Sequence, residues 1–392
     1  MITELTLHNW KSFADATLYI DPLTFIIGTN ASGKSNILDA LDFLKKIASR
    51  IPIDEAAHAI RGGKDWVIRK GAEDFSIKVK IQNGSTYFYT IAVERKNGAY
   101  ELKTEVLSEV LPDGSLRTIF TSEWQTVNDS GLAYWTKLSG DMWVSFSDED
   151  QNFSAAISAV SIFPLSKEDK EAINTVVRNL KNIFILNPIP ASMRSYVPVS
   201  DVLKSDASNL AGMIAGLDDK TKFEVEQALT AYIKPLPGRD VIRIWAEKVG
   251  LKDSDAMLYC EENWNGTPLQ LDARGMSDGT LRFIAIVIAL LTGVENSLLI
   301  VEEVDNGLHP SRSEELLRVL HELGTKRSID VICTTHNPVL IDTLGNAMVP
   351  FISYVKRNSS GDSEILLLEE KENLAKLMAG NSLGGLMTND LL

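Results

Sequence analysis

The sequence predicts an α/β fold with a mainly parallel sheet flanked by helices, an antiparallel β subdomain and an inserted segment. In the last third of the chain, short apolar strand patterns alternate with helical patterns, which is typical of a parallel sheet with helices on both faces. Near the N-terminus, the apolar run LTFII ends at Gly28 and a helical pattern begins near Lys34. Residues 75–95 alternate around Asn83-Gly84, a strong signal for an antiparallel hairpin.

The other elements are expected in order along the chain. Period-2 alternation predicts strands in the first thirty residues, and the weaker pattern from about 100 to 165 indicates an inserted, mostly β or irregular segment. Later elements are expected as helices at 167–181 (capped by Ser166), 205–233 (broken near Gly216), 279–292, 311–324 and 338–344, and as strands at 182–188, 297–303, 329–336 and 350–357. We expect one domain over 1–392, composed of a lobe at 1–100, an insert at 101–180, a helical or linking part at 181–265 and a lobe at 266–392.

Composition restricts the class of protein. The net charge of −14 argues against a surface that coats nucleic acid as a whole, although a local basic groove stays compatible with it. Cys260 and Cys333 are too few and too far apart for a disulfide framework or a zinc site. The longest apolar run, 283–291, is too short for a membrane span, and no signal peptide pattern precedes the first strand. We therefore expect a cytoplasmic protein that does not contact a membrane.

Residues 28–35, GTNASGKS, match the phosphate-loop pattern G-x-x-x-x-G-K-[ST]. Glycines let the backbone approach phosphate oxygens, and N–H groups at the following helix start point at the anion. Lys34 would reach the β and γ phosphates of ATP, and the Ser35 hydroxyl would ligate Mg²⁺. The alternative is a chance glycine turn, but the position between a buried strand and a helix favours phosphate binding. The predicted nucleotide-binding residues of this segment are Gly28, Asn30, Ala31, Ser32, Gly33, Lys34, Ser35 and Asn36.

Polar residues follow two later strands. Glu302 and Glu303 end the strand SLLIVEE, and His336 follows the apolar strand VICTT. Beside a phosphate loop, Glu302 would hold Mg²⁺ and Glu303 would orient or deprotonate the attacking water. His336 would hydrogen-bond the γ-phosphate or the water, because ligands of open α/β sheets bind at carboxyl ends of strands. The alternatives are a solvated strand end for the two glutamates and a capping or core role for the histidine.

Together these segments resemble the ABC-type ATPases of the RecF/SMC/OLD group, over nearly the whole chain. Besides the opening LTLHNWKSF and the phosphate loop, ARGMSDGTLR (273–282) looks like the signature segment of that group. LLIVEEVDNGLHPSR resembles its Walker B and D-loop segment, CTTHNPVLID resembles its switch-histidine segment, and SLGGLMTNDLL looks like the end of stand-alone OLD-like ATPases. The resemblance implies a P-loop NTPase fold of the ABC-ATPase head type, without a nuclease domain.

The resemblance also implies a head-to-tail homodimer. ATP on the phosphate loop of one subunit would be closed by Ser277 and Gly279 of the other, and Asp305 in the D-loop would contact the partner's site. From the residues alone, Ser277 is an N-cap for an apolar helix, and both roles are compatible. The chain departs from many ABC ATPases by carrying Glu302 where Asp is common, and it offers no clear Q-loop glutamine beyond Gln82.

The leading functional hypothesis is an ATP-hydrolysing dimeric switch. Its output would go to an effector such as a nuclease, or to DNA or RNA, in DNA repair or anti-phage defence. The alternative is an ATP-dependent scaffold or sensor that does not hydrolyse the nucleotide, whereas a membrane-transporter ATPase fits the signature poorly. The basic segment IRGGKDWVIRK is either a solvated loop or a nucleic-acid contact; its candidate residues are Arg61, Lys64, Trp66, Arg69 and Lys70.

Overall fold

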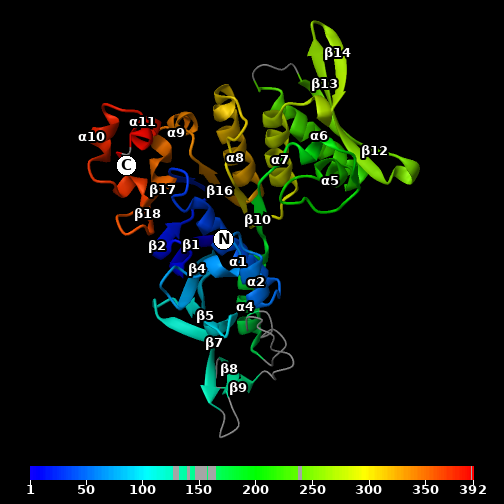
Figure 1. The fold of residues 1–392 in the computed structure, drawn as a ribbon. Helices are drawn as coiled ribbons and strands as arrows, with labels where there is room; N and C mark the ends of the chain where they lie inside the picture. Colours follow the sequence, from blue (N-terminus) through cyan, green and yellow to red (C-terminus); the bar gives the residue numbers. More distant parts are fainter. Residues whose placement is uncertain (127–131, 139–141, 146–156, 158–164, 237–240, 390) are drawn as a thin grey trace. The chain divides into compact units, whose positions relative to one another are not determined.

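A computed structural model describes the chain except residues 127–131, 139–141, 146–156, 158–164, 237–240 and 390 (Figure 1). The chain folds into two compact units. Unit 1 contains residues 1–21, 28–183 and 353–367. Unit 2 contains residues 22–27, 184–352 and 368–392. The expectation of one domain with four parts stays a prediction.

Unit 1 is built on an antiparallel sheet. Within the described residues it has eight strands in the order β2-β1-β4-β5-β6-β7-β8-β9. Their bounds are β1 Ile2–Trp10, β2 Phe13–Tyr19, β4 Asp74–Asn83, β5 Ser85–Lys96, β6 Ala99–Val110, β7 Leu116–Thr126, β8 Leu132–Leu138 and β9 Met142–Ser145. The predicted hairpin is confirmed, because Asn83 pairs with Ser85 across Gly84, whose φ of 73° suits a tight turn.

Short helices and a second hairpin complete unit 1. They are α1 Lys34–Ala48, α2 Ile53–His58, η1 Lys64–Trp66, α4 Lys167–Lys181, β17 Ile352–Arg357 (from residue 353) and β18 Ser363–Leu367. The predicted start of α4 is confirmed, since the Ser166 side chain accepts from the Asp169 N–H. Trp10, Phe43 and Phe75 pack with ring centroids 5.0–5.6 Å apart and join α1 to the sheet.

Unit 2 carries the predicted parallel strands. The order is β10-β15-β16-β3, with bounds β10 Ile183–Leu186 (from residue 184), β15 Ser297–Val301, β16 Ile329–Thr335 and β3 Leu23–Ile27. β3 and β15 are buried at every position, as expected for strands covered on both faces. β16 runs parallel to both neighbours, and it pairs Cys333 with Val301 and Thr335 with Ile27. The carboxyl ends of β3, β15 and β16 therefore lie side by side.

Helices of unit 2 are α5 Leu210–Gly216, α6 Asp219–Ile233, α7 Asp278–Thr292, α8 Ser313–Arg327, α9 Pro338–Leu344, α10 Leu374–Met378 and α11 Leu383–Thr388. The predicted break near Gly216 is confirmed, but residues 205–209 are not helical. α5 packs against a neighbouring strand segment so closely that a Cβ on Gly212 would lie 2.0 Å from the Pro198 carbonyl oxygen. Short 3₁₀ turns, including η4 Ser192–Arg194 and η6 Ala273–Gly275, connect these elements.

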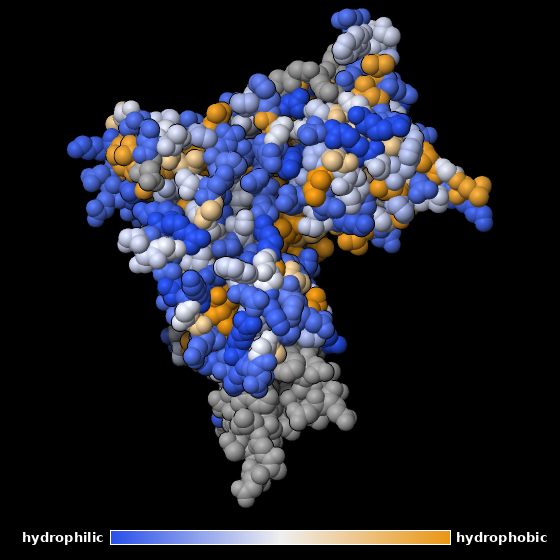
Figure 2. Space-filling model, viewed as in Figure 1, coloured by the Kyte–Doolittle hydropathy of each residue, from blue (hydrophilic) through white to orange (hydrophobic). Residues whose placement is uncertain are grey.

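Unit 2 also contains an antiparallel sheet that the sequence reading missed. In the described part of the chain it consists of β11 Val197–Pro198, β12 Val241–Val249, β13 Asp255–Trp264 and β14 Thr267–Asp272. The interpretation of 181–265 as helical or linking is therefore wrong for these strands. Helices α5 and α6 cover one face of this sheet (Figure 1). Leu251, between β12 and β13, is exposed. Figure 2 shows hydrophobic residues of the visible surface in orange.

Across the described residues, the structure has no helix that is both long and apolar enough to span a membrane.

Candidate functional site

The phosphate loop, residues 28–35, connects β3 to α1 in a conformation that requires glycine at two positions. Gly28 and Gly33 have φ of 151° and 120°, where a side chain is strained. A Cβ on Gly28 would lie 2.2 Å from the Val355 carbonyl oxygen, and one on Gly33 would lie 2.4 Å from Ser363 Oγ. With glycine at these two positions, the loop backbone can approach its neighbours and a ligand more closely than it could with any other residue there.

Residues far away in the sequence hold this loop in place. Ser363 Oγ donates to the Ser32 carbonyl (2.5 Å) and is hydrogen-bonded to the Ser12 hydroxyl (2.8 Å). Arg357 Nε donates to the Ala31 carbonyl at 3.1 Å. These bonds tie two carbonyl groups of the loop to Arg357 and Ser363. Sequence reasoning missed Ser12, Arg357 and Ser363, because they belong to no recognisable motif.

The start of α1 is suited to an external anion. Gly33 occupies the N-cap position without any side-chain hydrogen bond to the first turn. Ser32 Oγ is buried and has no hydrogen-bond partner among the described residues. Lys34 Nζ donates to the carbonyls of Gly28 (2.7 Å) and Thr29 (2.9 Å), which places its ammonium group against the loop. An uncapped helix start, an unsatisfied hydroxyl and a cation match the donors that a phosphate chain needs.

The remaining predicted residues of the loop differ in their surroundings. Asn30 and Ala31 are exposed, and Ala31 has a left-handed φ of 62°. Ser35 is half-buried in the first turn of α1, where its carbonyl accepts from Arg61 Nη2 at 3.4 Å. Asn36 donates from Nδ2 to Ser12 Oγ at 2.7 Å, so in this structure its side chain supports the β1–β2 turn.

Glu302 lies directly after β15, one residue beyond the last strand position. Glu302 is only 8% exposed, and its backbone N–H donates to the Leu186 carbonyl at 3.1 Å. Asn187 Nδ2 donates to Glu302 Oε2 at 3.4 Å. A nearly buried carboxylate needs such partners, because desolvation penalises the charge. Asn187, at the end of β10, orients the carboxylate and was not predicted.

Glu303 adopts a left-handed backbone conformation with φ of 47°. Because β15 ends at Val301, the predicted strand over 297–303 is two residues too long. Consecutive residues of a strand point to opposite faces of the sheet. Because Glu303 leaves the strand conformation here, the Glu302 and Glu303 side chains are not restricted to opposite faces. It is held by the Glu303 N–H, which donates to Thr334 Oγ1 at 2.9 Å.

The side chain of Glu303 meets the end of β16. His336 Nδ1 lies 3.9 Å from Glu303 Oε1, and Asn306 Nδ2 donates to Glu303 Oε2 at 3.2 Å. Glu303 and His336 are both partly exposed, with side-chain exposures of 43% and 44%. The structure therefore brings together the two residues predicted to be catalytic, where solvent reaches both.

The D-loop, residues 304–308, folds back on the same strand end. Thr335 Oγ1 donates to Asp305 Oδ1 at 2.6 Å and accepts from the Asn337 N–H at 3.0 Å. Asp305 was predicted to contact a partner subunit; in this chain its carboxylate is bonded to its own β16. This bond fixes the D-loop to the element that carries His336.

The signature segment, residues 273–282, starts α7 as an ordinary capped helix. Ser277 Oγ accepts from the Thr280 N–H at 3.2 Å, which confirms the N-cap reading, and the residue is exposed. Gly279 is buried against the D-loop, since a Cβ there would lie 2.4 Å from the Gly307 carbonyl oxygen. Arg194 Nη2 pairs with Asp278 Oδ1 at 2.6 Å. Of the predicted residues Ser277 and Gly279, Ser277 therefore presents a side chain to solvent, whereas Gly279 is buried.

The basic segment around residues 61–70 is largely paired within unit 1. Arg61 Nε bonds Asp39 Oδ1 at 2.8 Å, and Arg69 forms a two-point pair with Asp362 at 2.7 and 2.8 Å. Lys64 Nζ donates to the Gly98 carbonyl at 3.2 Å. These contacts favour the surface-loop interpretation.

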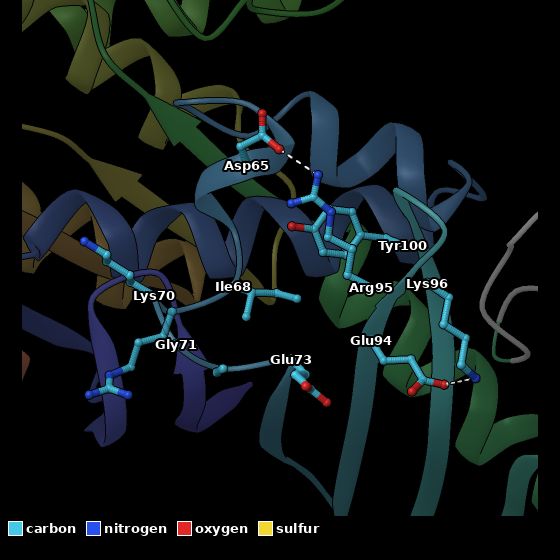
Figure 3. Close-up of a pocket in the computed structure, with 11 residues that line it drawn as sticks. Asp65, Ile68, Lys70, Gly71, Glu73, Glu94, Arg95, Lys96 and Tyr100 are labelled. Carbon is cyan, nitrogen blue, oxygen red and sulfur yellow. Dashed lines mark hydrogen bonds and ion pairs between the residues drawn. The ribbon is translucent and has the colours of Figure 1, made fainter.

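A pocket of about 580 Å³ adjoins this segment (Figure 3). Its walls pair cations with carboxylates: Arg95 with Asp65 at 2.8 Å and Lys96 with Glu94 at 2.5 Å. A wall of paired charges has little net attraction for a polyanion. Gln82 lies near the hairpin end of β4 and is exposed, so nothing here supports it as a Q-loop residue.

The two oxygen donors predicted for Mg²⁺ belong to different units, Ser35 to unit 1 and Glu302 to unit 2. Among residues whose placement is described, no group of three His, Cys, Asp or Glu side chains could hold a metal ion. Mg²⁺ is usually bound by one or two protein oxygens together with substrate phosphates and water. The Ser35 hydroxyl and the Glu302 carboxylate are oxygen donors of that kind.

The fold and these motifs define an ABC-type ATPase of the RecF/SMC/OLD-like group. The chain belongs to the family described as "AAA domain, putative AbiEii toxin, Type IV TA system", which matches residues 23–342.

The chain is similar to one curated protein and to two solved structures. "DNA replication and repair protein RecF" from Nocardioides sp. (strain ATCC BAA-499 / JS614) is 34% identical over 73 residues, which cover 18% of this chain and 17% of RecF. The chain is also similar to a Pyrococcus furiosus Smc head domain with an extended coiled coil, which is bound to the C-terminal domain of ScpA. The two chains are 12% identical with a TM-score of 0.50, and the match covers 96% of this chain and 99% of the Smc chain. An SmcHead bound to the C-winged helix domain of ScpA has 15% identity and a TM-score of 0.49 over 93% and 96% of the two chains. The Pyrococcus likeness confirms the predicted P-loop, ABC-ATPase head-like fold.

Proposed function

We propose that this protein is a dimeric switch that binds and hydrolyses ATP. The observation that carries the proposal is the register of the parallel strands. Ile27 pairs with Thr335, and the phosphate loop begins at the next residue, Gly28. Val301 pairs with Cys333, so the acidic pair and His336 follow strand ends in the same edge of the sheet. Ligands of such sheets bind at that edge.

Each residue has a role in this proposal. The N–H groups of the phosphate loop and Lys34 bind the phosphate chain, and Ser35 and Glu302 supply oxygen ligands for Mg²⁺. When bound, Mg²⁺ would neutralise charge on the β and γ phosphates. Glu303 accepts a proton from the attacking water or orients it, and His336 hydrogen-bonds the γ-phosphate or that water.

The pairing of Glu303 with His336 favours hydrolysis over a scaffold that only holds ATP. A base needs a neighbour that orients it and access for water; Asn306 donates to the Glu303 carboxylate at 3.2 Å, and the partial exposure of Glu303 admits water. The left-handed φ of Glu303 is a costly conformation of the kind that accompanies functional sites. The scaffold or sensor alternative would not need it.

We also propose that ATP joins two subunits head to tail. The exposed Ser277 hydroxyl at the start of α7 would hydrogen-bond the γ-phosphate held by the partner. Gly279 would contribute only backbone groups, since the position that its Cβ would occupy is filled by Gly307 of its own chain. Asp305 would act at the interface through the D-loop.

The output of the switch is proposed to be a protein effector, such as a nuclease, or a nucleic acid. The likeness to RecF, a replication and repair protein by its name, supports a role near DNA, and the toxin family supports anti-phage defence. The Pyrococcus furiosus Smc head domain is bound to the C-terminal domain of ScpA, which supports a protein partner. All of these roles belong to the cytoplasm.

The test measures solution mass and phosphate release together. Glu303→Gln protein should roughly double in mass with ATP and Mg²⁺, because nucleotide is held but not cleaved, while wild-type protein releases phosphate and Glu303→Gln does not. Adding Ser277→Arg should abolish the mass increase. Ser382→Arg is the matched control, since Ser382 caps α11 with the same 3.2 Å bond.

Two results would contradict the proposal. Phosphate release that survives Glu303→Gln would remove Glu303 from the chemistry. If the protein binds ATP but its mass does not change, the dimer joined by ATP is contradicted. If the wild-type protein releases no phosphate, the scaffold alternative is favoured.

A further inference from the structure

The sheet of β12, β13 and β14 has one face covered by helices. Ile244 and Ala246 of β12 are buried, and α5 and α6 pack on their side of the sheet (Figure 1). Successive residues of a strand point to opposite faces. Arg243, Trp245 and Glu247 therefore point away from these helices, and none of the three is buried. We call the side of β12 and β13 that carries them the open face.

The edges of this sheet do not invite a further strand. At the β12 edge, the Ile244 N–H donates to Thr230 Oγ1 of α6 at 3.1 Å. The Ala246 N–H donates to Glu226 Oε1 of the same helix at 2.9 Å. On the other side, β14 contains Pro268, which has no N–H to offer a neighbouring strand. Since an unpaired edge is the usual place where a sheet pairs with another chain, a partner of this sheet must use the open face instead.

The open face carries aromatic rings with an arginine over them. Trp245 stacks on Tyr259 of β13, with ring centroids 5.6 Å apart and an angle of 19° between the planes. The Arg243 guanidinium lies 4.1 Å from the Trp245 ring centroid, and its Nε donates to Glu261 Oε2 at 2.9 Å. The Arg243 side chain is nevertheless 53% exposed. Trp, Tyr and Arg are the residue types enriched at the centres of protein interfaces.

The charges of this region oppose a nucleic acid as its occupant. Glu247, Glu261 and Asp272 lie on the same side of the sheet, as their strand pairing shows. Two arginines accompany them, Arg243 bonded to Glu261 and Arg274 bonded to Asp272 at 2.5 Å. Glu247 forms no ion pair with any residue whose placement is described. Carboxylates thus outnumber guanidinium groups, which disfavours a phosphate backbone and leaves a protein surface as the partner.

The arrangement of the charges is self-complementary. Arg243 and Glu247 lie two residues before and two residues after Trp245, so both share its face at about 7 Å along the strand. A two-fold axis that lies in the interface and crosses β12 at Trp245 exchanges these two positions. It brings Arg243 of each copy opposite Glu247 of the other, as a symmetric interface requires. Glu247 then gains the cation that it lacks in a single chain.

We propose that the open face binds the open face of a second copy of this chain, in a two-fold dimer that forms without ATP. The inference does not rest on the proposed function, because it involves no nucleotide. β12 has nine residues, and three strands of that length present roughly 430 Å² of face at about 3.3 Å per residue and about 4.8 Å per strand. A stable interface covers about 800 Å² on each partner, so the dimer is weak. Its dissociation constant should be on the order of tens of micromolar, since even larger interfaces extend to the micromolar range.

Sedimentation of nucleotide-free protein over a concentration series tests the proposal, with Arg243→Glu and Glu247→Arg as the variants. The first variant places four carboxylates at the two contacts of its own dimer, and the second places four cations there. Each should weaken self-association by at least about tenfold, because like charges that face each other repel. An equimolar mixture of the two variants places opposite charges at both contacts. The mixed dimer should therefore recover the wild-type affinity to within about threefold.

The matched controls are Arg318→Glu and Glu322→Arg, which reverse a surface ion pair on α8 and change the net charge by the same amounts. Self-association of each control should stay within about twofold of wild type. Loss of association in the controls as well would assign the effect to net charge and overturn the proposal.

Two further results would overturn it. Wild-type protein that stays monomeric throughout the series would leave the open face to a different occupant. Variants that fail to recover on mixing would show that Arg243 and Glu247 do not meet between copies. Thermal melting monitors folding. If Arg243→Glu does not fold, because Glu261 then faces a second carboxylate, Glu261→Gln is added and the mixing experiment is repeated.

Discussion

The phosphate loop and the signature segment both place glycine and serine at the start of a 15-residue helix, yet they are held in opposite ways. α1 starts at Gly33 without a side-chain cap, while Ser32 Oγ lacks a partner in the described part of the chain. α7 starts at Ser277, whose hydroxyl already caps the helix. The difference teaches that one helix start leaves its donors without a side-chain cap, whereas the other is capped by a serine of its own chain.

The largest effect is expected at the uncapped helix. Lys34→Met should weaken ATP binding on the order of a hundredfold, because it leaves the phosphate chain without the cation that lies against the loop. Thermal stability without nucleotide should change little. Isothermal titration with ATP and Mg²⁺ measures the first effect and melting measures the second. Unchanged affinity would remove the contrast between the two helix starts.

A stability effect is expected where the signature segment meets the D-loop. Gly279→Ala places a methyl group 2.4 Å from the Gly307 carbonyl oxygen, and overpacking of this kind costs about 1–3 kcal/mol. The melting temperature should fall by several degrees without any nucleotide. Gly380→Ala is the control, since nothing lies within 4 Å of its Cβ position. Equal melting temperatures would mean that Gly279 is not held by its own D-loop.

The two roles of Ser277 separate in one substitution. Ser277→Ala loses the cap, about 1 kcal/mol, whereas Ser277→Asp keeps it because aspartate is an equally good N-cap. In the Glu303→Gln background, both should lose ATP-dependent association, since Asp places a negative charge against the partner's phosphate. An aspartate variant that still dimerises with ATP would restrict Ser277 to capping.

The smallest effect concerns the support of the phosphate loop. Arg69 holds the pKa of Asp362 below its usual range, through a hydrogen bond at a part-buried site. A lowered pKa contributes stability that is present above about pH 4 and lost as the pH falls through the folded-state value. Wild-type protein should melt slightly above Asp362→Asn near pH 6, and the difference should shrink below pH 4. A constant difference would assign the effect to something other than this charge.

Local patterns predicted most of what is local. The phosphate loop, the hairpin at Gly84 and the caps at Ser166 and Ser277 follow from short sequence motifs, and the structure agrees. The sheet of β12, β13 and β14 escaped detection, because a half-exposed antiparallel sheet interleaves charged and apolar residues without a clear period.

Residues that support the site were missed for a different reason. Ser363, Arg357 and Asn187 reach the loop or Glu302 across the fold, and nothing in their own neighbourhood marks them. Tertiary partners of this kind cannot be derived from spacing along one chain.

The bonds from Ser363 to Ser32 and Ser12 close chain loops that span 331 and 351 residues. Contacts of such long sequence separation form late in folding, because the intervening chain must first become ordered. The phosphate loop is synthesised early, yet its final shape waits for the hairpin of β17 and β18. A nascent or truncated chain that lacks this hairpin should therefore contain the whole nucleotide-binding motif and still bind ATP poorly.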